Sequence, residues 1–136
     1  MELNQDFYDL LQFLNAEHVE YLVVGGYAVM VYSEPRYTKD LDIWINPDPD
    51  NAKAVWRALA AFGAPLENVS LEDFSDPEMI YQIGIAPNRI DILMDVLGVD
   101  FPSAWQRRKT MHYGETPMHL IGEEDLIKSK LATGRA

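Results

Sequence analysis

Residues 40–45 carry the pattern that most restricts how this chain can fold, because every second side chain there is aliphatic. In a β-strand, successive side chains point to opposite faces of the sheet. The alternation therefore predicts a strand with one aliphatic face, formed by Leu41, Ile43 and Ile45. Asp40 and Asp42 fall on the opposite face. The strand thus presents two carboxylates on one side and buries the other.

Helix and strand patterns alternate along the rest of the chain. Residues 64–78 are expected to form a loop with one helical turn. No internal repeat or linker interrupts the pattern, so we expect one α+β domain over residues 1–136, with a mixed sheet flanked by helices. The expected helices cover residues 5–17, 28–32, 52–62, 102–108 and 123–132, and the expected strands cover residues 21–24, 40–45, 79–85, 89–96, 110–113 and 116–120.

The composition excludes several classes of protein. The 136 residues include 11 Lys and Arg against 22 Asp and Glu, so the formal net charge at pH 7 is −11. A chain this acidic does not hold nucleic acid by general phosphate neutralisation. The lack of cysteine excludes disulfides, thiolate catalysis and thiolate zinc sites. The sequence shows neither a signal-peptide pattern nor an apolar run of membrane-spanning length, so we expect a cytoplasmic protein without a membrane partner.

Three short motifs occur in one order: Val24-Gly25-Gly26, Asp40-Leu41-Asp42 and Ile90-Asp91-Ile92. Taken singly, a diglycine is ordinarily a turn, and two acids on a strand ordinarily form a solvated face. Taken together, they suit metal binding, because acids two apart on a strand lie about 6.5–7 Å apart on one face. A third acid from a neighbouring strand would complete an oxygen cage for divalent cations. Without a cation, each pair would repel by about 4 kcal/mol at 4 Å and an effective dielectric constant near 20.

The diglycine is expected to open a helix directly after a buried strand. Free backbone amides at a helix N-terminus attract phosphate oxygens, and Gly25 and Gly26 have no Cβ to obstruct a triphosphate. A metal cluster and a phosphate cradle on one sheet indicate phosphoryl or nucleotidyl transfer.

The ordered motifs resemble the signature of the DNA polymerase β-like nucleotidyltransferase superfamily. In this chain, thirteen residues separate the diglycine from Asp40, and Asp91 between two isoleucines matches the third carboxylate of that signature. More narrowly, residues 25–29 and 36–42 resemble the minimal bacterial nucleotidyltransferases related to AbiEii-type toxins. The resemblance implies a mixed sheet flanked by helices, a nucleoside triphosphate substrate and two Mg²⁺ ions. It also implies transfer of a nucleoside monophosphate to an acceptor hydroxyl.

The same resemblance implies roles for individual residues. Asp40 and Asp42 would form a metal-binding pair, and Asp91 would bind the catalytic metal and help to activate the attacking hydroxyl. The residues that would contact the triphosphate are Gly25, Gly26, Arg36 and Lys130.

The acceptor and the choice of nucleotide are left open by these residues. The acceptor could be RNA, a protein or a small molecule. The resemblance to AbiEii-type toxins implies a toxin with an antitoxin protein as its partner. The basic run at residues 107–109 is either solvated surface or a contact for RNA, and Trp44 either packs beside the nucleotide or covers the sheet. Relatives often continue beyond a Gly-Arg pair like that at 134–135, so we expect a pared-down form or a missing C-terminal extension.

Two other functions compete with transfer. The first is a binding module on the same fold that holds a nucleotide or a protein without turnover. The second is a metal-dependent phosphodiesterase or nuclease, which can also use clustered acids but usually places a histidine or lysine beside them.

Overall fold

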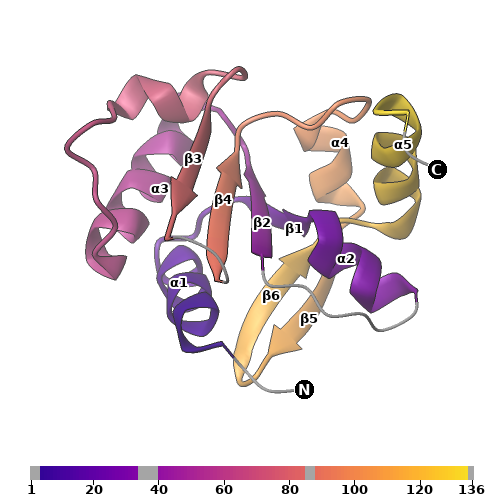
Figure 1. The fold of residues 1–136 in the computed structure, drawn as a ribbon, viewed down its shortest axis with the longest axis horizontal. Helices are drawn as coiled ribbons and strands as arrows, with labels where there is room; N and C mark the ends of the chain where they lie inside the picture. The colour runs from indigo at the N-terminus through magenta and orange to yellow at the C-terminus, as the bar shows by residue number, and fades with distance from the viewer. Residues whose placement is uncertain (1–3, 34–39, 85–87, 135–136) are drawn as a thin grey trace.

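The computed structural model describes residues 4–33, 40–84 and 88–134, in which helices and strands alternate (Figure 1). The helices are α1 (Gln5–Ala16), α2 (Gly25–Tyr32), α3 (Pro49–Phe62), the 3-10 helix η1 (Leu71–Ser75), α4 (Phe101–Gln106) and α5 (Glu123–Ala132). The strands are β1 (Tyr21–Val24), β2 (Asp40–Ile45), β3 (Ile80–Ile83), β4 (Arg89–Leu93), β5 (Lys109–Tyr113) and β6 (Thr116–Leu120).

The strands form one mixed sheet in the order β3-β4-β2-β1-β6-β5. The inner strand β2 pairs antiparallel with β1 on one side and parallel with β4 on the other. β1 also pairs parallel with β6, while β3 and β5 are antiparallel edge strands. A mixed sheet with flanking helices is the α+β architecture expected from the sequence.

Helices cover both faces of this sheet. Tyr21 lies opposite Ile45 in the register, and its hydroxyl donates to Asn15 Oδ1 of α1 at 2.9 Å, so α1 covers the face of Ile45. α3 packs against α1. On the other face, Trp44 packs edge-on against Phe101 of α4, with ring centroids 5.0 Å apart. In Figure 1, α1 and α3 accordingly lie to the left of the strands and α2, α4 and α5 to the right.

The helix expected over residues 52–62 begins three residues earlier, at Pro49. The side chain of Asp48 caps it by accepting a hydrogen bond from the Asp50 amide at 3.1 Å. Proline is tolerated at the first helical position because its missing N–H needs no partner there. The helix ends at Gly63, whose φ of +94° is the left-handed conformation typical of a C-cap.

The strand expected over residues 89–96 ends earlier, at Leu93. Leu93 is the last residue of β4 to pair, with Trp44 on one side and Ile80 on the other. Beyond it, Val96 forms an isolated bridge with Val99 in the connection to α4.

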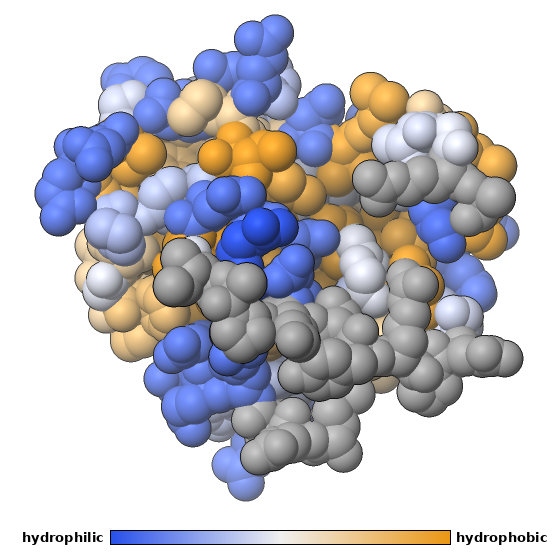
Figure 2. All heavy atoms as spheres, in the orientation of Figure 1, coloured by the Kyte–Doolittle hydropathy of each residue, from blue (hydrophilic) through white to orange (hydrophobic). Residues whose placement is uncertain are grey.

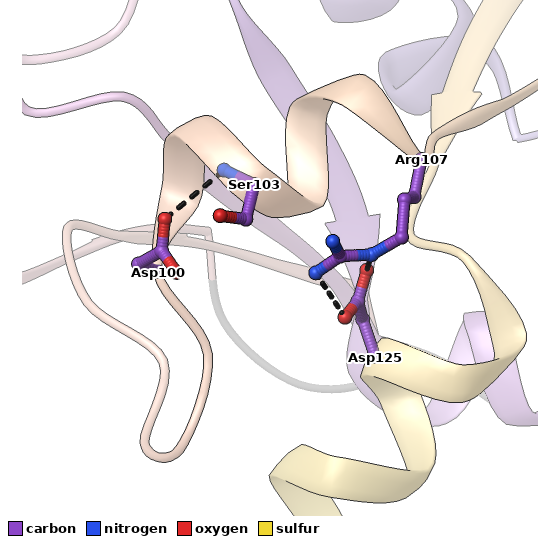
Figure 3. Close-up of polar contacts among 4 residues, drawn as sticks. All are labelled: Asp100, Ser103, Arg107 and Asp125. Carbon is purple, nitrogen blue, oxygen red and sulfur yellow. Dashed lines mark hydrogen bonds and ion pairs between the residues drawn. The ribbon is translucent and has the colours of Figure 1, made fainter.

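An ion pair between an exposed arginine and a buried acid ties the end of α4 to α5 (Figure 3). Arg107 donates from Nε and Nη2 to the two carboxylate oxygens of Asp125 at 2.9 and 2.8 Å, and Asp125 is 1% exposed. Asp100 caps the start of α4 by accepting from the Ser103 amide at 3.0 Å. One arginine of the basic run 107–109 therefore neutralises a buried carboxylate, which would be costly to leave unpaired.

No helix in the described ranges is long and apolar enough to cross a lipid bilayer. The surface seen in Figure 2 mixes hydrophilic and hydrophobic side chains, with hydrophobic surface visible on the side of α5. Ile127 and Leu131, one turn apart on that helix, are among the exposed large apolar residues.

Candidate functional site

Backbone pairing brings the acids of β2 and β4 together. Asp42 lies directly opposite Asp91 in the parallel register, and Asp40 lies opposite Arg89. Paired residues and residues two apart along a strand share a face of the sheet, so these four side chains lie on one face. On the other side of β2, Val24 is paired with Asp42, which places the start of α2 beside the carboxylates.

Arg89 bridges two of the three acids. Its Nε lies 3.1 Å from Asp91 Oδ1, and its Nη2 lies 3.5 Å from Asp40 Oδ2. Asp91 is the most enclosed of the three acids, at 8% exposure. Although Arg89 Nε and Asp91 Oδ1 are close, neither atom makes a well-directed hydrogen bond with any residue in the described ranges. The arginine thus supplies charge without satisfying the buried oxygen.

Asp42 is the acid whose titration the cluster changes most clearly. Its pKa is raised to about 6, first by burial and then by the negative charges of Asp91 and Asp40. A hydrogen bond with the Asp91 side chain also raises this pKa, whereas the charge of Arg89 lowers it. Ionised Asp42 therefore destabilises the metal-free fold near neutral pH.

Gly25 lets the Asp42 carboxylate lie against the backbone at the start of α2. Its φ is +67°, in the left-handed region that glycine adopts without strain. A Cβ at this position would overlap Asp42 Oδ2 and lie 2.9 Å from Asp42 Cγ. The space left by this glycine therefore accommodates Asp42. Val24, the N-cap residue of α2, makes no side-chain hydrogen bond to the first-turn amides.

The remaining candidate residues lie on α2, on α5 or outside the described part. Gly26 is in the first turn of α2, next to Gly25. Lys130 is half-buried in the last turn of α5, a helix that contacts α2. Arg36 lies outside the described residues. Contacts of these three with a triphosphate remain predictions.

Trp44 has a structural role. It is 1% exposed and packs against Phe101. Of its two interpretations, the structure supports the one in which it covers the sheet.

Arg89 is the member of the cluster that sequence reasoning missed. The signal was present in its position, because Arg89 precedes Asp91 by two residues on an alternating strand and must share its face. Ile90 and Ile92, at 3% and 0% exposure, occupy the buried opposite face.

The carboxylate oxygens of this cluster are the type of ligand that binds a hard divalent cation. Carboxylate oxygens from two adjacent strands are the ligands that Mg²⁺ prefers, and a cation would relieve the repulsion that raises the pKa of Asp42. Within the described ranges, no group of three or more Asp, Glu or His side chains forms a ready-made cage for a metal ion. Arg89 reaches both Asp40 and Asp91. The acids thus fit a metal chemically, while the guanidinium pairs with two of them.

A pocket of about 220 Å³ lies elsewhere, at α3 and η1. None of its lining residues belongs to the carboxylate cluster; they are Lys53, Trp56, Arg57 and Leu71.

The contact between Gly25 and Asp42 can be tested by adding a methyl group. Gly25→Ala should lower the free energy of unfolding by at least about 2 kcal/mol more than Gly63→Ala, because overpacking adds to the left-handed strain. Gly63 also has positive φ, but a Cβ there meets nothing within 4 Å, so it isolates the backbone effect. Urea denaturation of both variants measures the difference. Equal losses would contradict the close approach of Asp42.

The raised pKa of Asp42 predicts a pH dependence of stability. In EDTA, the wild type should lose about 1–2 kcal/mol of unfolding free energy relative to Asp42→Asn between about pH 4 and pH 7.5. The sign follows because the folded pKa, about 6, lies above the ordinary 3.8, so the folded state binds more protons in this window. Urea denaturation across the range measures it. Parallel curves for the two proteins would show that Asp42 is not perturbed.

Comparison with known proteins finds similarity in structure but not in sequence families. No family model and no curated protein matches this chain. A solved structure does match: TM1012 of Thermotoga maritima, determined at 1.87 Å and described as a candidate nucleotidyltransferase. The match covers 98% of this chain and 88% of that one, with a TM-score of 0.68 and 14% sequence identity. At this identity the likeness shows the fold alone: the two proteins share an α+β fold with a mixed sheet flanked by helices.

Proposed function

We propose that this protein is a metal-dependent nucleotidyltransferase that moves a nucleoside monophosphate from a nucleoside triphosphate to an acceptor hydroxyl. The observation that carries the proposal is the pairing of Asp42 with Asp91 on adjacent strands, beside the glycine that opens α2. The fold shared with a candidate nucleotidyltransferase supports the same reaction class.

In the proposed reaction, a bond forms between the acceptor oxygen and the α-phosphorus, and the bond from that phosphorus to the bridging oxygen of pyrophosphate breaks. Asp40, Asp42 and Asp91 would hold two Mg²⁺ ions, which when bound supply charge stabilisation for the attacking and leaving oxygens. Asp91, the most enclosed acid, would orient the acceptor hydroxyl and accept its proton as the new bond forms. The first-turn amides of α2 would bind phosphate oxygens.

The electrostatics of the site favour transfer over a binding module. Burial and two neighbouring acids raise the pKa of Asp42, so the cluster opposes folding when no cation is bound. A domain that held only a protein partner, without a cation, would gain nothing from this arrangement. The nuclease alternative ordinarily calls for a histidine or lysine beside the acids, whereas the basic residue that pairs with these acids within residues 4–33, 40–84 and 88–134 is Arg89.

Removing one carboxylate tests the activity. Asp42→Asn should lower pyrophosphate release from nucleoside triphosphates in Mg²⁺ by at least about 100-fold, because the metal ions that would stabilise the developing negative charge lose a carboxylate ligand. The assay uses ATP, CTP, GTP and UTP in turn, each with a labelled α-phosphate. RNA, the protein itself and aminoglycosides serve as acceptors, and the position of the label identifies the acceptor.

Glu115→Gln is the matched control, because it removes an exposed acid in the turn between β5 and β6. It should retain wild-type activity. A folded Asp42→Asn protein with full activity would exclude the metal-binding role. Tight nucleotide binding without pyrophosphate release in the wild type would favour the binding module. Hydrolysis without transfer of the label would favour the nuclease.

The proposal extends to a toxin role with an antitoxin protein as partner, which the sequence resemblance alone supports. Expression of the wild type in a bacterial host should then arrest growth, and the Asp42→Asn variant should not.

A further inference from the structure

Arg89 occupies an unusual place in the carboxylate cluster. It lies on β4 directly opposite Asp40 and two residues before Asp91, so its side chain shares their face of the sheet. Its guanidinium lies within ion-pair distance of both acids, at 3.5 Å from Asp40 and 3.1 Å from Asp91. One cationic side chain therefore partly neutralises the acids that the proposed function assigns to metal binding.

The contact between Arg89 and Asp91 is incomplete. Arg89 Nε and Asp91 Oδ1 are both buried, yet neither makes a well-directed hydrogen bond in the described part of the chain. By contrast, Arg107 makes a bidentate contact with the buried Asp125, with both hydrogen bonds under 3 Å. Arg89 holds its acids by charge more than by matched hydrogen bonds, and such a contact is easier to exchange for another cation.

The Arg89 side chain can also move away from the acids toward solvent. Its side chain is 39% exposed, while that of Asp91 is 12% exposed. A long arginine side chain can keep its stem on the protein and move its charged head into water. The partly exposed side chain of Arg89 can therefore withdraw without unfolding β4, whereas Asp91 stays enclosed.

We propose that Arg89 and a divalent cation are alternative partners of Asp91 and Asp40, so that Arg89 holds the empty site together and sets its metal affinity. The inference rests on the proposed function, because it takes these acids as metal ligands. Arg89 is then a positioning residue, whose guanidinium must leave the carboxylate oxygens before they can coordinate an ion. The apparent metal affinity equals the intrinsic affinity multiplied by the fraction of molecules in which Arg89 is withdrawn.

Metal binding without nucleotide tests the proposal directly. We expect Arg89→Gln to bind Mn²⁺ about tenfold more tightly than the wild type, because the competing charge is gone. Arg89→Lys retains the charge and should bind Mn²⁺ nearly as weakly as the wild type. Arg57→Gln is the matched control, since Arg57 pairs with one partly exposed acid, Glu17, at 2.8 Å. Electron paramagnetic resonance of free Mn²⁺ and isothermal titration calorimetry both measure the dissociation constant.

Stability provides a second readout. Arg89→Gln should unfold at a lower temperature than the wild type in EDTA and gain more from saturating Mn²⁺. Arg57→Gln should show the wild-type response to the ion. A purely structural role for Arg89 would lower the unfolding temperature and leave the Mn²⁺ dissociation constant unchanged.

The outcomes separate this inference from the proposed function. Unchanged or weaker Mn²⁺ binding by folded Arg89→Gln overturns the role of Arg89; if Asp91→Asn then abolishes Mn²⁺ binding, the metal site stands without it. Tighter binding by Arg89→Gln that disappears in the double variant with Asp91→Asn supports both. Mn²⁺ binding that is unaffected by Asp42→Asn and Asp91→Asn overturns both.

Discussion

The parallel pairing of β2 with β4 is the constraint on which the candidate site depends. It places Asp42 opposite Asp91, although the two are distant in the chain. A shift of one residue in this register would turn Asp91 toward the aliphatic face, because side chains alternate along a strand. The antiparallel pairing of β2 with β1 then brings Gly25 to the same place. Two backbone ladders, rather than any loop, hold the acids and the start of α2 together.

The cluster works against the stability of the fold that holds it. Burial and neighbouring charges raise the pKa of Asp42, and Gly25 must adopt positive φ without a side chain to admit its carboxylate. Arg89 offsets part of the repulsion. Burial of the apolar core between the sheet and its helices offsets the destabilisation that remains. Like charges kept together in this way are typical of functional sites.

The sequence was most informative about which face of a strand is buried and least informative about which strands pair with each other. Alternation in residues 40–45 predicts which side chains are buried, because that periodicity is a local property. The partner of each strand depends on the whole sheet, so the approach of Asp91 to Asp42 could be expected only from the resemblance. Arg89 shares the face of Asp91 and was predictable from alternation. The burial of Asp125 was not predictable from the sequence, since an acid in the first turn of a helix is ordinarily exposed to solvent. Its partner, Arg107, comes from another element.

The most direct test of the account is a crystal structure grown with Mn²⁺ and a non-hydrolysable nucleoside triphosphate analogue, with anomalous data collected for manganese. The account predicts an anomalous peak coordinated by oxygens of both Asp42 and Asp91, with the triphosphate beside Gly25 and Gly26. Bound nucleotide without manganese between those acids, or manganese bound only elsewhere on the surface, would contradict it.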